Sequence, residues 1–372
     1  MKTALLQHWM TKSGGAERVL RTLCGMYPDA DMFTHAYIPA KAPGFERHRV
    51  SESFIARLPF GREHPQAYLP LLPLASRAFD LSAYDLIISS EAGPIKGIRK
   101  RMDQRHVCYC HSPMRYIWDM YDEYYRNAGF GGKLAMRLFA PQMRRADLKS
   151  AESVDVFVAN SRYIAGRIKR IYGRDSEVVH PPCDIEFFSA PIEQANNRTV
   201  EQSPYYLVAG RLVGYKRADL ALRACLRMGR KLVIVGIGEQ ERPLRKIAGG
   251  SDLVTFRRRI SDEELRRIYQ GARALLFPGL EDFGIVPVEA QAAGTPVIAF
   301  GEGGALETVK DGETGLYLNE QTEESLCHAI EEFESRDWDR VKCILNATRF
   351  GQAAFMDGMR AVIETLPKGE CL

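Results

Sequence analysis

Short apolar runs alternate along the chain with longer segments in which apolar residues recur at helical spacing. In the first half we expect helices over residues 16–26, 133–149 and 162–172. The apolar runs predict strands at residues 3–7, 32–37, 85–89, 106–110, 154–160 and 177–180. Strands that alternate with helices are typical of a doubly wound parallel sheet, because each parallel connection needs a crossover.

The same alternation restarts near Tyr205, after a polar stretch at 186–203 that we interpret as a linker. The second series predicts helices over residues 218–228, 262–272 and 286–293, followed by a helical tail. Its expected strands cover residues 205–209, 231–235, 253–256, 274–277 and 296–300. The predicted parts are an α/β domain over 1–185, the linker, a second α/β domain over 204–345 and a C-terminal helix over 346–372.

The composition is that of an ordinary globular protein, with 45% hydrophobic and 26% charged residues among 372. No apolar run approaches the roughly 20 residues that span a bilayer. The first residues become polar too soon for a signal peptide and predict a strand, so we expect a cytoplasmic protein. The eight cysteines are scattered without a disulfide framework, which fits reduced thiols.

The net charge of +4 is too small to indicate a nucleic-acid partner. Residues 91–150, however, hold 12 Lys or Arg against 6 Asp or Glu and are rich in aromatic residues. Basic residues interleaved with aromatic and aliphatic ones suit an anionic membrane surface or a lipid diphosphate. A solvated helix face with its core stripe gives the same pattern, so both interpretations stay open.

One group of residues has the composition of a metal site. His106, Cys108 and Cys110 alternate, so on a strand they share a face, and such ligands are typical of zinc sites. No second Cys/His pair is placed to complete a tetrahedron, and cysteine is a common buried hydrophobic residue. We therefore predict no metal site.

The most informative segment begins at Glu281. Glu281 and Glu289 bracket a glycine-containing turn that follows an apolar run, and we expect a helix to begin near Val286. Backbone N–H groups at a helix start can bind phosphate or sugar oxygens, and carboxylates accept hydrogen bonds from vicinal hydroxyls. The segment therefore predicts a ligand site, although two exposed glutamates around a turn are also common.

Two other loops carry features that suit phosphate. Arg211 follows a predicted strand, and Lys216 lies at the next transition from loop to helix. A guanidinium and an ammonium placed in this way would stabilise a leaving diphosphate. Gly14 and Gly15 follow the first strand and open a helix, which allows close backbone approach to an anion.

Together these motifs resemble the retaining, nucleotide-sugar-dependent glycosyltransferases of family 4. The match is to their Glu-x7-Glu signature, here EDFGIVPVEAQAAGTPVIAF at 281–300, and to the basic pair Arg211 and Lys216. Residues 110–119, CHSPMRYIWD, are similar to a segment in bacterial O-antigen and exopolysaccharide mannosyltransferases. The resemblance covers nearly the whole chain. It implies the GT-B fold, in which two Rossmann-like domains face a cleft and a C-terminal helix crosses back to the N-terminal domain.

The resemblance assigns catalytic roles to His111, Arg211, Lys216 and Glu281. The histidine would hydrogen-bond the donor sugar near the reacting centre, the two basic residues would hold the diphosphate, and Glu281 would contact sugar hydroxyls. The implied donor-binding residues are Gly14, Gly15, Arg211, Lys216, Phe283, Gly284, Ile285 and Glu289. The first two glycines would lie beside the donor phosphate and the acceptor. Backbone N–H groups of 283–285 would complete the sugar pocket, and Glu289 would accept bonds from ribose hydroxyls.

The implied activity is transfer of a hexose, in first place mannose from GDP-mannose, to a polyprenyl-diphosphate saccharide in surface polysaccharide synthesis. The enzyme would be cytoplasmic and peripherally associated with the inner membrane, and it would need no cofactor beyond the sugar nucleotide. Asp29-Ala30-Asp31 spells the Asp-x-Asp with which other glycosyltransferases bind Mn²⁺. It precedes a strand far from the donor motifs, so we expect metal independence.

Three alternatives stay open. A UDP-hexose is an alternative donor, because none of these residues fixes the base. Arg257-Arg258-Arg259 stands where related proteins have an apolar residue and a glycine, so the base-pocket geometry implied by the resemblance stays open. A GT-B nucleotide-sugar epimerase would share the fold and some carboxylates but would need no acceptor. A membrane-associated protein that only binds sugar nucleotides would not need the complete set of catalytic residues.

Overall fold

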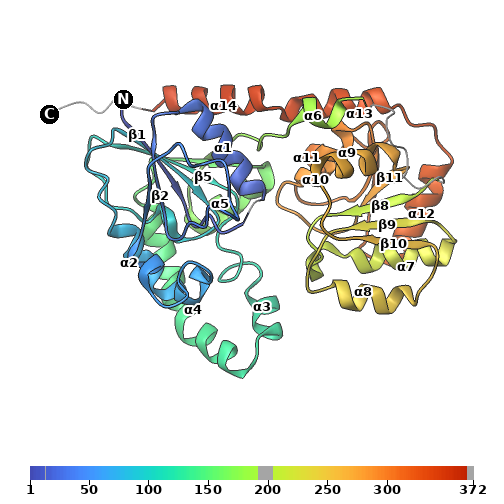
Figure 1. Ribbon diagram of the computed structural model, residues 1–372, viewed down its shortest axis with the longest axis horizontal. Helices are drawn as coiled ribbons and strands as arrows, with labels where there is room; N and C mark the ends of the chain where they lie inside the picture. Colours follow the sequence, from blue (N-terminus) through green and yellow to red (C-terminus); the bar gives the residue numbers. More distant parts are fainter. Residues whose placement is uncertain (13, 192–203, 367–372) are drawn as a thin grey trace. The chain divides into compact units, whose positions relative to one another are not determined.

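The computed structural model describes residues 1–12, 14–191 and 204–366. These residues form two α/β units, each built around one parallel sheet (Figure 1). The first unit comprises Met1–Pro182 together with the chain from Phe355 onward, and the second comprises Cys183–Ala354. The predicted doubly wound parallel arrangement is therefore confirmed in both halves of the chain.

The sheet of the first unit has the strand order β3-β2-β1-β4-β5-β6-β7 in the described part of the chain, and all of its pairs are parallel. The order reverses between β1 and β4, so the chain leaves the carboxyl ends of these neighbouring strands in opposite directions. Its strands are β1 (Thr3–Gln7), β2 (Asp31–Thr34), β3 (Val50–Glu52), β4 (Leu86–Glu91), β5 (Arg105–Cys110), β6 (Val156–Ala159) and β7 (Ser176–Val178).

Helices cover both faces of this sheet. On one face Leu5 and Tyr109 pack in a core with α1 (Gly15–Met26) and α14 (Gln352–Glu364). Helix α14 contributes Phe355, Met359, Val362 and Ile363 to that core, so the predicted return of the C-terminal helix to the N-terminal unit is confirmed. The opposite face packs against α5 (Arg162–Tyr172) and the end of α4 (Phe130–Ala151).

The sheet of the second unit has the order β10-β9-β8-β11-β12-β13 in the described part of the chain, again with parallel pairs throughout. Here the order reverses between β8 and β11. Its strands are β8 (Tyr206–Ala209), β9 (Leu232–Val235), β10 (Val254–Arg257), β11 (Ala274–Phe277), β12 (Val297–Phe300) and β13 (Gly315–Leu318).

The two faces of the second sheet are covered by separate helical layers. One core joins the sheet to α7 (Ala218–Met228), α8 (Glu241–Ala248) and α12 (Glu323–Glu334). The other core is covered by α6 (Ile185–Ser189), α9 (Asp262–Gly271), α10 (Ile285–Ala292), α11 (Ala305–Thr308) and α13 (Arg340–Ala347). Strands β8, β9, β11 and β12 are therefore buried on both sides, which explains their nearly continuous apolar sequences.

The observed bounds of the units differ from the predicted domain bounds. Phe188 of α6 packs in a core of the second unit, so the beginning of the predicted linker 186–203 belongs to that unit, and residues 192–203 lie outside the described residues. Phe350 packs there too, which extends the unit beyond residue 345. The expected tail helix 346–372 is interrupted at Gly351, whose backbone is extended, and residues 367–372 are not described.

Short edge strands were missed by the sequence analysis. Strand β3 has only three residues, two of them polar, and β13 begins with a glycine, so neither shows a clear apolar run. None of the helices in the described ranges has the length and apolar character needed to cross a membrane.

A buried cluster of three charged side chains fixes α4 to the sheet of the first unit. Lys96 Nζ lies 2.6 Å from Glu91 Oε1 and 2.5 Å from Asp147 Oδ1, and all three side chains are buried. The second oxygen of Asp147 accepts hydrogen bonds from Trp118 Nε1 at 2.8 Å and Tyr172 Oη at 2.9 Å. Burial raises the pKa of Glu91 to about 7. Burial also opposes the charged form of Lys96, but the carboxylates of Asp147 and Glu91 outweigh it and raise the pKa of Lys96 well above its usual value. The cluster thus joins the end of β4 to α4 and α5.

Replacing Lys96 by Met should strongly destabilise the first unit, because it leaves two buried carboxylates without their cation. We expect a loss of about 3–5 kcal/mol in the free energy of unfolding. The measurement is urea denaturation followed by the fluorescence of Trp9 and Trp118, which both belong to this unit. The matched control is Lys100→Met, which breaks a partly exposed pair with Asp155 and should cost about 0–1 kcal/mol. Equal losses for the two variants would contradict a special role of the cluster.

Candidate active site

In the second unit, the loops that follow β8 and β11 carry most of the predicted site. In open α/β sheets, ligands bind outside the carboxyl ends of strands where the strand order reverses, and these two strands lie at that reversal. Arg211 follows β8 after a single glycine, and Glu281 lies four residues beyond the end of β11. Residues separated widely in sequence therefore reach the same edge of the sheet.

Lys216 and Glu281 form an ion pair at this edge. Lys216 Nζ lies 2.7 Å from Glu281 Oε1, and the two side chains are 17% and 14% exposed. A short 3₁₀ turn at Gly214–Lys216 positions the lysine, whose ammonium also lies 6.0 Å from the centre of the Phe277 ring. The pair is therefore only partly shielded from water and has one apolar wall.

Two glycines, Gly279 and Gly304, allow the loops that carry Lys216 and Glu281 to lie in close contact. A Cβ atom at Gly279 would lie 2.6 Å from Lys216 Cα, and one at Gly304 would lie 2.3 Å from Phe283 Cα. The N–H of Gly304 donates to the carbonyl of Glu281 at 2.9 Å, which ties the loop after β12 to the loop after β11. Side chains at these glycines would push the Lys216 and Glu281 loops apart.

The predicted backbone pocket at 283–285 coincides with the beginning of α10. Gly284 precedes the helix in the left-handed conformation, with φ of 85°, and no side chain caps the helix. The first N–H groups of α10 thus keep the capacity to bind an anion, which the helix dipole favours.

Glu289 lies in the interior of α10 and is 4% exposed. Its Oε2 accepts a hydrogen bond from Tyr269 Oη of α9 at 3.0 Å. Tyr269 was not predicted as a site residue, because its link to Glu289 depends on the packing of two helices. The predicted contact of Glu289 with ribose remains a prediction.

The remaining basic residues of this edge differ in their surroundings. Arg211 is exposed and its Nη2 donates to Tyr215 Oη at 3.1 Å, which leaves most of the guanidinium available to a ligand. In the arginine run at the end of β10, Arg258 is exposed and its Nε lies 3.3 Å from Glu241 Oε1 of α8. Arg258 is therefore engaged at the surface by a carboxylate of the same unit.

In the first unit, His111 follows β5 at the carboxyl edge of the sheet. Its Nε2 lies 2.8 Å from Ser90 Oγ of β4, and its carbonyl accepts a hydrogen bond from Asn160 Nδ2 at 2.9 Å. Burial lowers the pKa of His111 to about 4, so the imidazole is neutral near pH 7. Ser90 and Asn160 were missed by the sequence analysis, because only the order of the strands places them beside the histidine.

Another histidine, His8, is buried and follows β1 on the same edge. Burial, followed by the nearby charges of His111, His35 and Lys12, lowers its pKa to about 3. A Cβ atom at Gly93 would lie 3.4 Å from His8 Cβ, so the loop after β4 closes over this ring. His8 was not recognised in the sequence, where a single histidine after a strand carries no signal.

Gly14 and Gly15 lie at the start of α1 and are exposed, and their contact with a ligand remains a prediction. No side chain caps this helix either. Glu17, in the first turn, is buried, and burial raises its pKa. The residue that precedes the two glycines lies outside the described residues.

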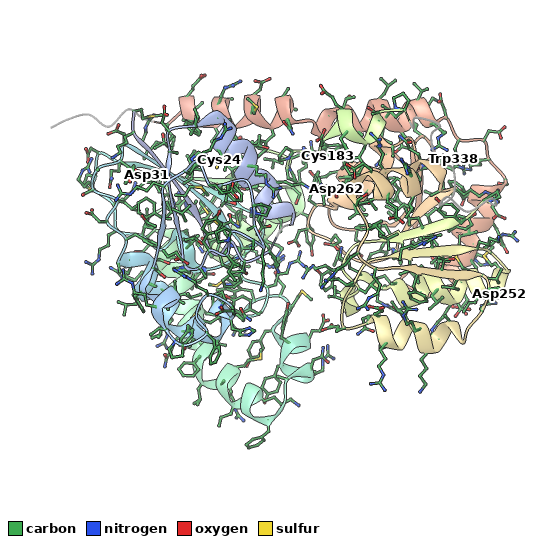
Figure 2. All side chains as sticks on the ribbon, viewed as in Figure 1. Cys24, Asp31, Cys183, Asp252, Asp262 and Trp338 are labelled. Carbon is green, nitrogen blue, oxygen red and sulfur yellow. The ribbon has the colours of Figure 1, made fainter. Side chains whose placement is uncertain are left out.

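The candidate metal ligands of the sequence are engaged in other contacts. His106 Nε2 lies 2.9 Å from Ser89 Oγ, and its Nδ1 lies 3.1 Å from the carbonyl of Ser153. Asp31, labelled in Figure 2, accepts a hydrogen bond from Tyr84 Oη at 2.6 Å. Within the described ranges, no three His, Cys, Asp or Glu side chains are grouped closely enough to hold a metal ion.

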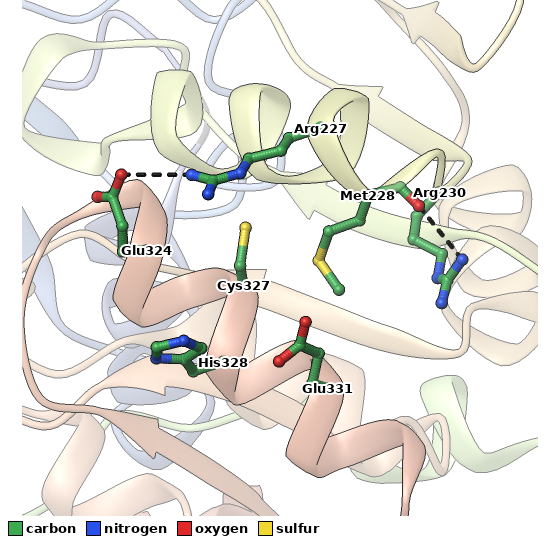
Figure 3. Close-up of a pocket in the computed structure, with 7 residues that line it drawn as sticks. All are labelled: Arg227, Met228, Arg230, Glu324, Cys327, His328 and Glu331. Atoms are coloured by element: carbon green, nitrogen blue, oxygen red, sulfur yellow. Dashed lines mark hydrogen bonds and ion pairs between the residues drawn. The ribbon is translucent and has the colours of Figure 1, made fainter.

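An open pocket of about 350 Å³ lies elsewhere on the second unit, between α7 and α12 (Figure 3). Arg227 Nη1 and Glu324 Oε1 form an ion pair across it at 3.3 Å. None of the predicted site residues lines this pocket. The predicted residues are thus gathered in two sets, each at the carboxyl edge of the sheet in its own unit.

Comparison with known proteins agrees with this division. A family profile described as Glycosyltransferase Family 4 matches residues 13–187, and one described as Glycosyl transferases group 1 matches residues 190–350.

Among curated relatives, the D-inositol 3-phosphate glycosyltransferase of Streptomyces bingchenggensis is 34% identical over 192 residues, which are 45% of this chain and 42% of that protein. The chain thus spans less than half the length of this relative in the alignment. The protein of the same name from Streptomyces coelicolor is 26% identical over 328 residues, covering 69% of this chain and 72% of the relative.

Solved structures show the same fold over nearly the whole chain. Alr3699/HepE from Anabaena, in complex with UDP and glucose, has a TM-score of 0.71 and 18% identity, covering 98% of this chain and 100% of its own. Sucrose-phosphate synthase from Thermosynechococcus elongatus has a TM-score of 0.75 and 21% identity, covering 98% of both chains. The chain therefore has the GT-B fold, and its two halves match the profiles of glycosyltransferase family 4 and of glycosyl transferases group 1 in turn.

Proposed function

We propose that the protein is a retaining glycosyltransferase that takes a hexose from a nucleoside-diphosphate sugar. The observation that carries this proposal is the pair of Lys216 and Glu281 beside the uncapped start of α10, at the reversal of the strand order. A cation, an anion-binding helix start and a carboxylate at one sheet edge are the groups that a sugar diphosphate requires.

The ion pair gives a physical account of donor binding. In the free protein, Lys216 Nζ and Glu281 Oε1 lie 2.7 Å apart as an ion pair. The diphosphate of a donor would bind the Lys216 ammonium, and the donor's hydroxyl groups would bind the Glu281 carboxylate. Each side chain would thus gain a new partner when the contact between them is replaced. Arg211 would add a planar, permanently charged group to the phosphate side.

Bond cleavage would be assisted by charge that is already in place. Negative charge grows on the phosphate oxygens as the glycosidic C–O bond breaks, and fixed cations with oriented N–H groups lower that barrier. Neutral His111, held by Ser90, would hydrogen-bond the donor sugar near the reacting carbon. For retention, the leaving phosphate would deprotonate the acceptor hydroxyl on the face from which it departs.

For the donor and acceptor, we propose mannose from GDP-mannose and a polyprenyl-diphosphate saccharide, at the cytoplasmic face of the inner membrane. Support comes from the resemblance of residues 110–119 to O-antigen and exopolysaccharide mannosyltransferases, and from the basic, aromatic segment at 91–150. A UDP-hexose is the second candidate donor, favoured by the UDP found in the Anabaena protein of similar fold.

The function is tested by incubating the purified protein with GDP- and UDP-sugars, with and without a lipid-linked acceptor extract. We expect GDP release from GDP-mannose that depends on the acceptor, and a product heavier by one hexose. Release of UDP instead would identify the second donor. Conversion of a sugar nucleotide without any acceptor would indicate an epimerase and would refute the transferase proposal.

Substitutions in the ion pair should separate chemistry from binding. Glu281→Ala should lower kcat by about 100-fold or more, because contacts to the reacting sugar are lost. Lys216→Ala should raise the KM for the donor by about tenfold and also lower kcat, since one charge-assisted contact to phosphate is removed. The measurement is steady-state kinetics of nucleotide release.

Arg227→Ala is the matched control, because it removes a basic residue of the same unit that forms a surface ion pair with Glu324. Its kinetics should remain those of the unchanged protein. Near-normal turnover of Glu281→Ala would remove this residue from the site, and unchanged donor binding by Lys216→Ala would refute its phosphate role.

Metal independence is a separate expectation, since the phosphate charge would be balanced by Arg211, Lys216 and the start of α10. Activity should survive dialysis against EDTA and should not rise by more than about twofold when Mn²⁺ or Mg²⁺ is restored. A strict requirement for either ion would contradict this expectation.

A further inference from the structure

Helix α4 presents a line of apolar side chains to solvent in its first half. Phe130, Leu134 and Leu138 are spaced by four residues, so they lie along one side of the helix, and they are 89%, 52% and 58% exposed. The helix packs on its own unit through a different side, with Ala140 and Met143 in a small core. We call Phe130, Leu134 and Leu138 the α4 stripe. Figure 1 shows α3 (Tyr121–Asn127) and the beginning of α4 projecting from the body of the first unit.

The charged residues of α4 up to Ala146 are all basic, whereas α3 carries Asp122 and Glu123 in its first turn. Between Tyr124 and Ala146 the chain has no Asp or Glu, and its basic residues are Arg126, Lys133, Arg137, Arg144 and Arg145. Arg126, Arg137 and Arg145 are exposed, and in the described part of the chain no carboxylate pairs with them. Other basic residues of the same unit do have such partners, as in the pairs Lys100–Asp155 and Lys169–Asp175.

The beginning of α4 adds further positive potential. The helix starts after Gly129, which provides no side-chain cap, and Phe130 is its first residue. The partial positive charge of the helix N-terminus is therefore exposed beside the most exposed aromatic side chain of the stripe.

We propose that the first half of α4 docks the protein on an anionic phospholipid surface. The α4 stripe enters the boundary between headgroups and acyl chains, while Arg137 and Arg145 contact lipid phosphates. This docking role rests on the proposed function in one respect, which is that a lipid-linked acceptor would itself lie at a membrane.

The shape and charge of the surface favour lipid over a protein partner. A helix with an apolar side and basic flanks is the form that lies in the plane of a membrane interface. Protein interfaces have a packed core within a rim of mixed polar groups, whereas the first half of α4 offers a single apolar line whose charged neighbours on the helix are basic. A fluid, uniformly negative partner matches these features, because it can surround separate apolar side chains and neutralise every arginine.

The other end of α4 is fixed to the sheet. Asp147 belongs to the buried cluster with Lys96 and Glu91, and Glu91 ends the strand that carries Ser90, the partner of His111. A membrane held at the first half of the helix would thus lie at a defined position relative to the histidine loop of the same unit.

The test is co-sedimentation of the full-length protein with vesicles of phosphatidylcholine that contain about one-third phosphatidylglycerol, compared with pure phosphatidylcholine. We expect binding to the anionic vesicles that weakens as salt is raised. The double variants Leu134→Ser/Leu138→Ser and Arg137→Glu/Arg145→Glu should each lower the partition coefficient by about tenfold or more. The matched control Leu74→Ser/Arg77→Glu changes an exposed leucine and arginine on α2 (Leu72–Arg77) and should bind as the unchanged protein does.

A conservative variant tests insertion directly. Phe130→Trp places a fluorophore at the tip of the α4 stripe, and its emission should shift to shorter wavelength when anionic vesicles are added. The difference spectrum against the unchanged protein removes the signal of the three natural tryptophans. An emission maximum that does not move while the protein sediments with vesicles would overturn the assignment of this helix.

Two further results separate this inference from the transferase proposal. Transfer to a short-chain, water-soluble acceptor should be unchanged in the stripe variants, so lost vesicle binding with intact transfer supports the docking role. If the variants alter the oligomeric state by analytical ultracentrifugation and no form binds vesicles, the surface is a protein interface and the inference is overturned. Vesicle binding that follows the α4 stripe in a protein without transferase activity would uphold the inference and refute the proposed function.

Discussion

The reversal of strand order in each parallel sheet is the constraint on which the candidate site depends. Parallel strands end at the same edge, so all loops at their carboxyl ends gather on one side of a unit. Where the order reverses, between β1 and β4 and between β8 and β11, neighbouring loops diverge and leave backbone and side chains accessible. Gly14, Arg211 and Glu281 lie in such loops.

The Lys96 cluster and the pair of Lys216 and Glu281 both join a lysine to carboxylates, but they differ in burial and in how easily the charges can separate. The cluster around Lys96 is fully buried and has hydrogen-bond partners on every side, so exchange of any partner would expose an unpaired charge to an apolar interior. The pair of Lys216 and Glu281 is partly exposed and has one apolar wall. It can separate at low cost when a ligand supplies new partners, whereas the Lys96 cluster keeps its geometry.

The sequence was sufficient for features that arise from local pattern. Alternating apolar runs and helical segments predicted both sheets, and a glycine turn between Glu281 and Glu289 predicted the start of α10. Features that arise from packing were not predictable. Ser90 meets His111 only because β4 and β5 are neighbours, and Tyr269 meets Glu289 only because α9 lies beside α10. The tail was predicted as one helix because a single glycine, Gly351, is a weak helix breaker in sequence.

The return of α14 to the first unit also has a consequence for synthesis. Phe355, Met359, Val362 and Ile363 complete a core that begins with Leu5 in the first strand. Domains otherwise tend to fold as units during synthesis, with the N-terminal one first. Here, the unit whose translation starts first is completed last, after the whole second unit has left the ribosome. Until then its apolar face lacks its final helix, so the nascent chain exposes a hydrophobic surface of the kind that chaperones bind.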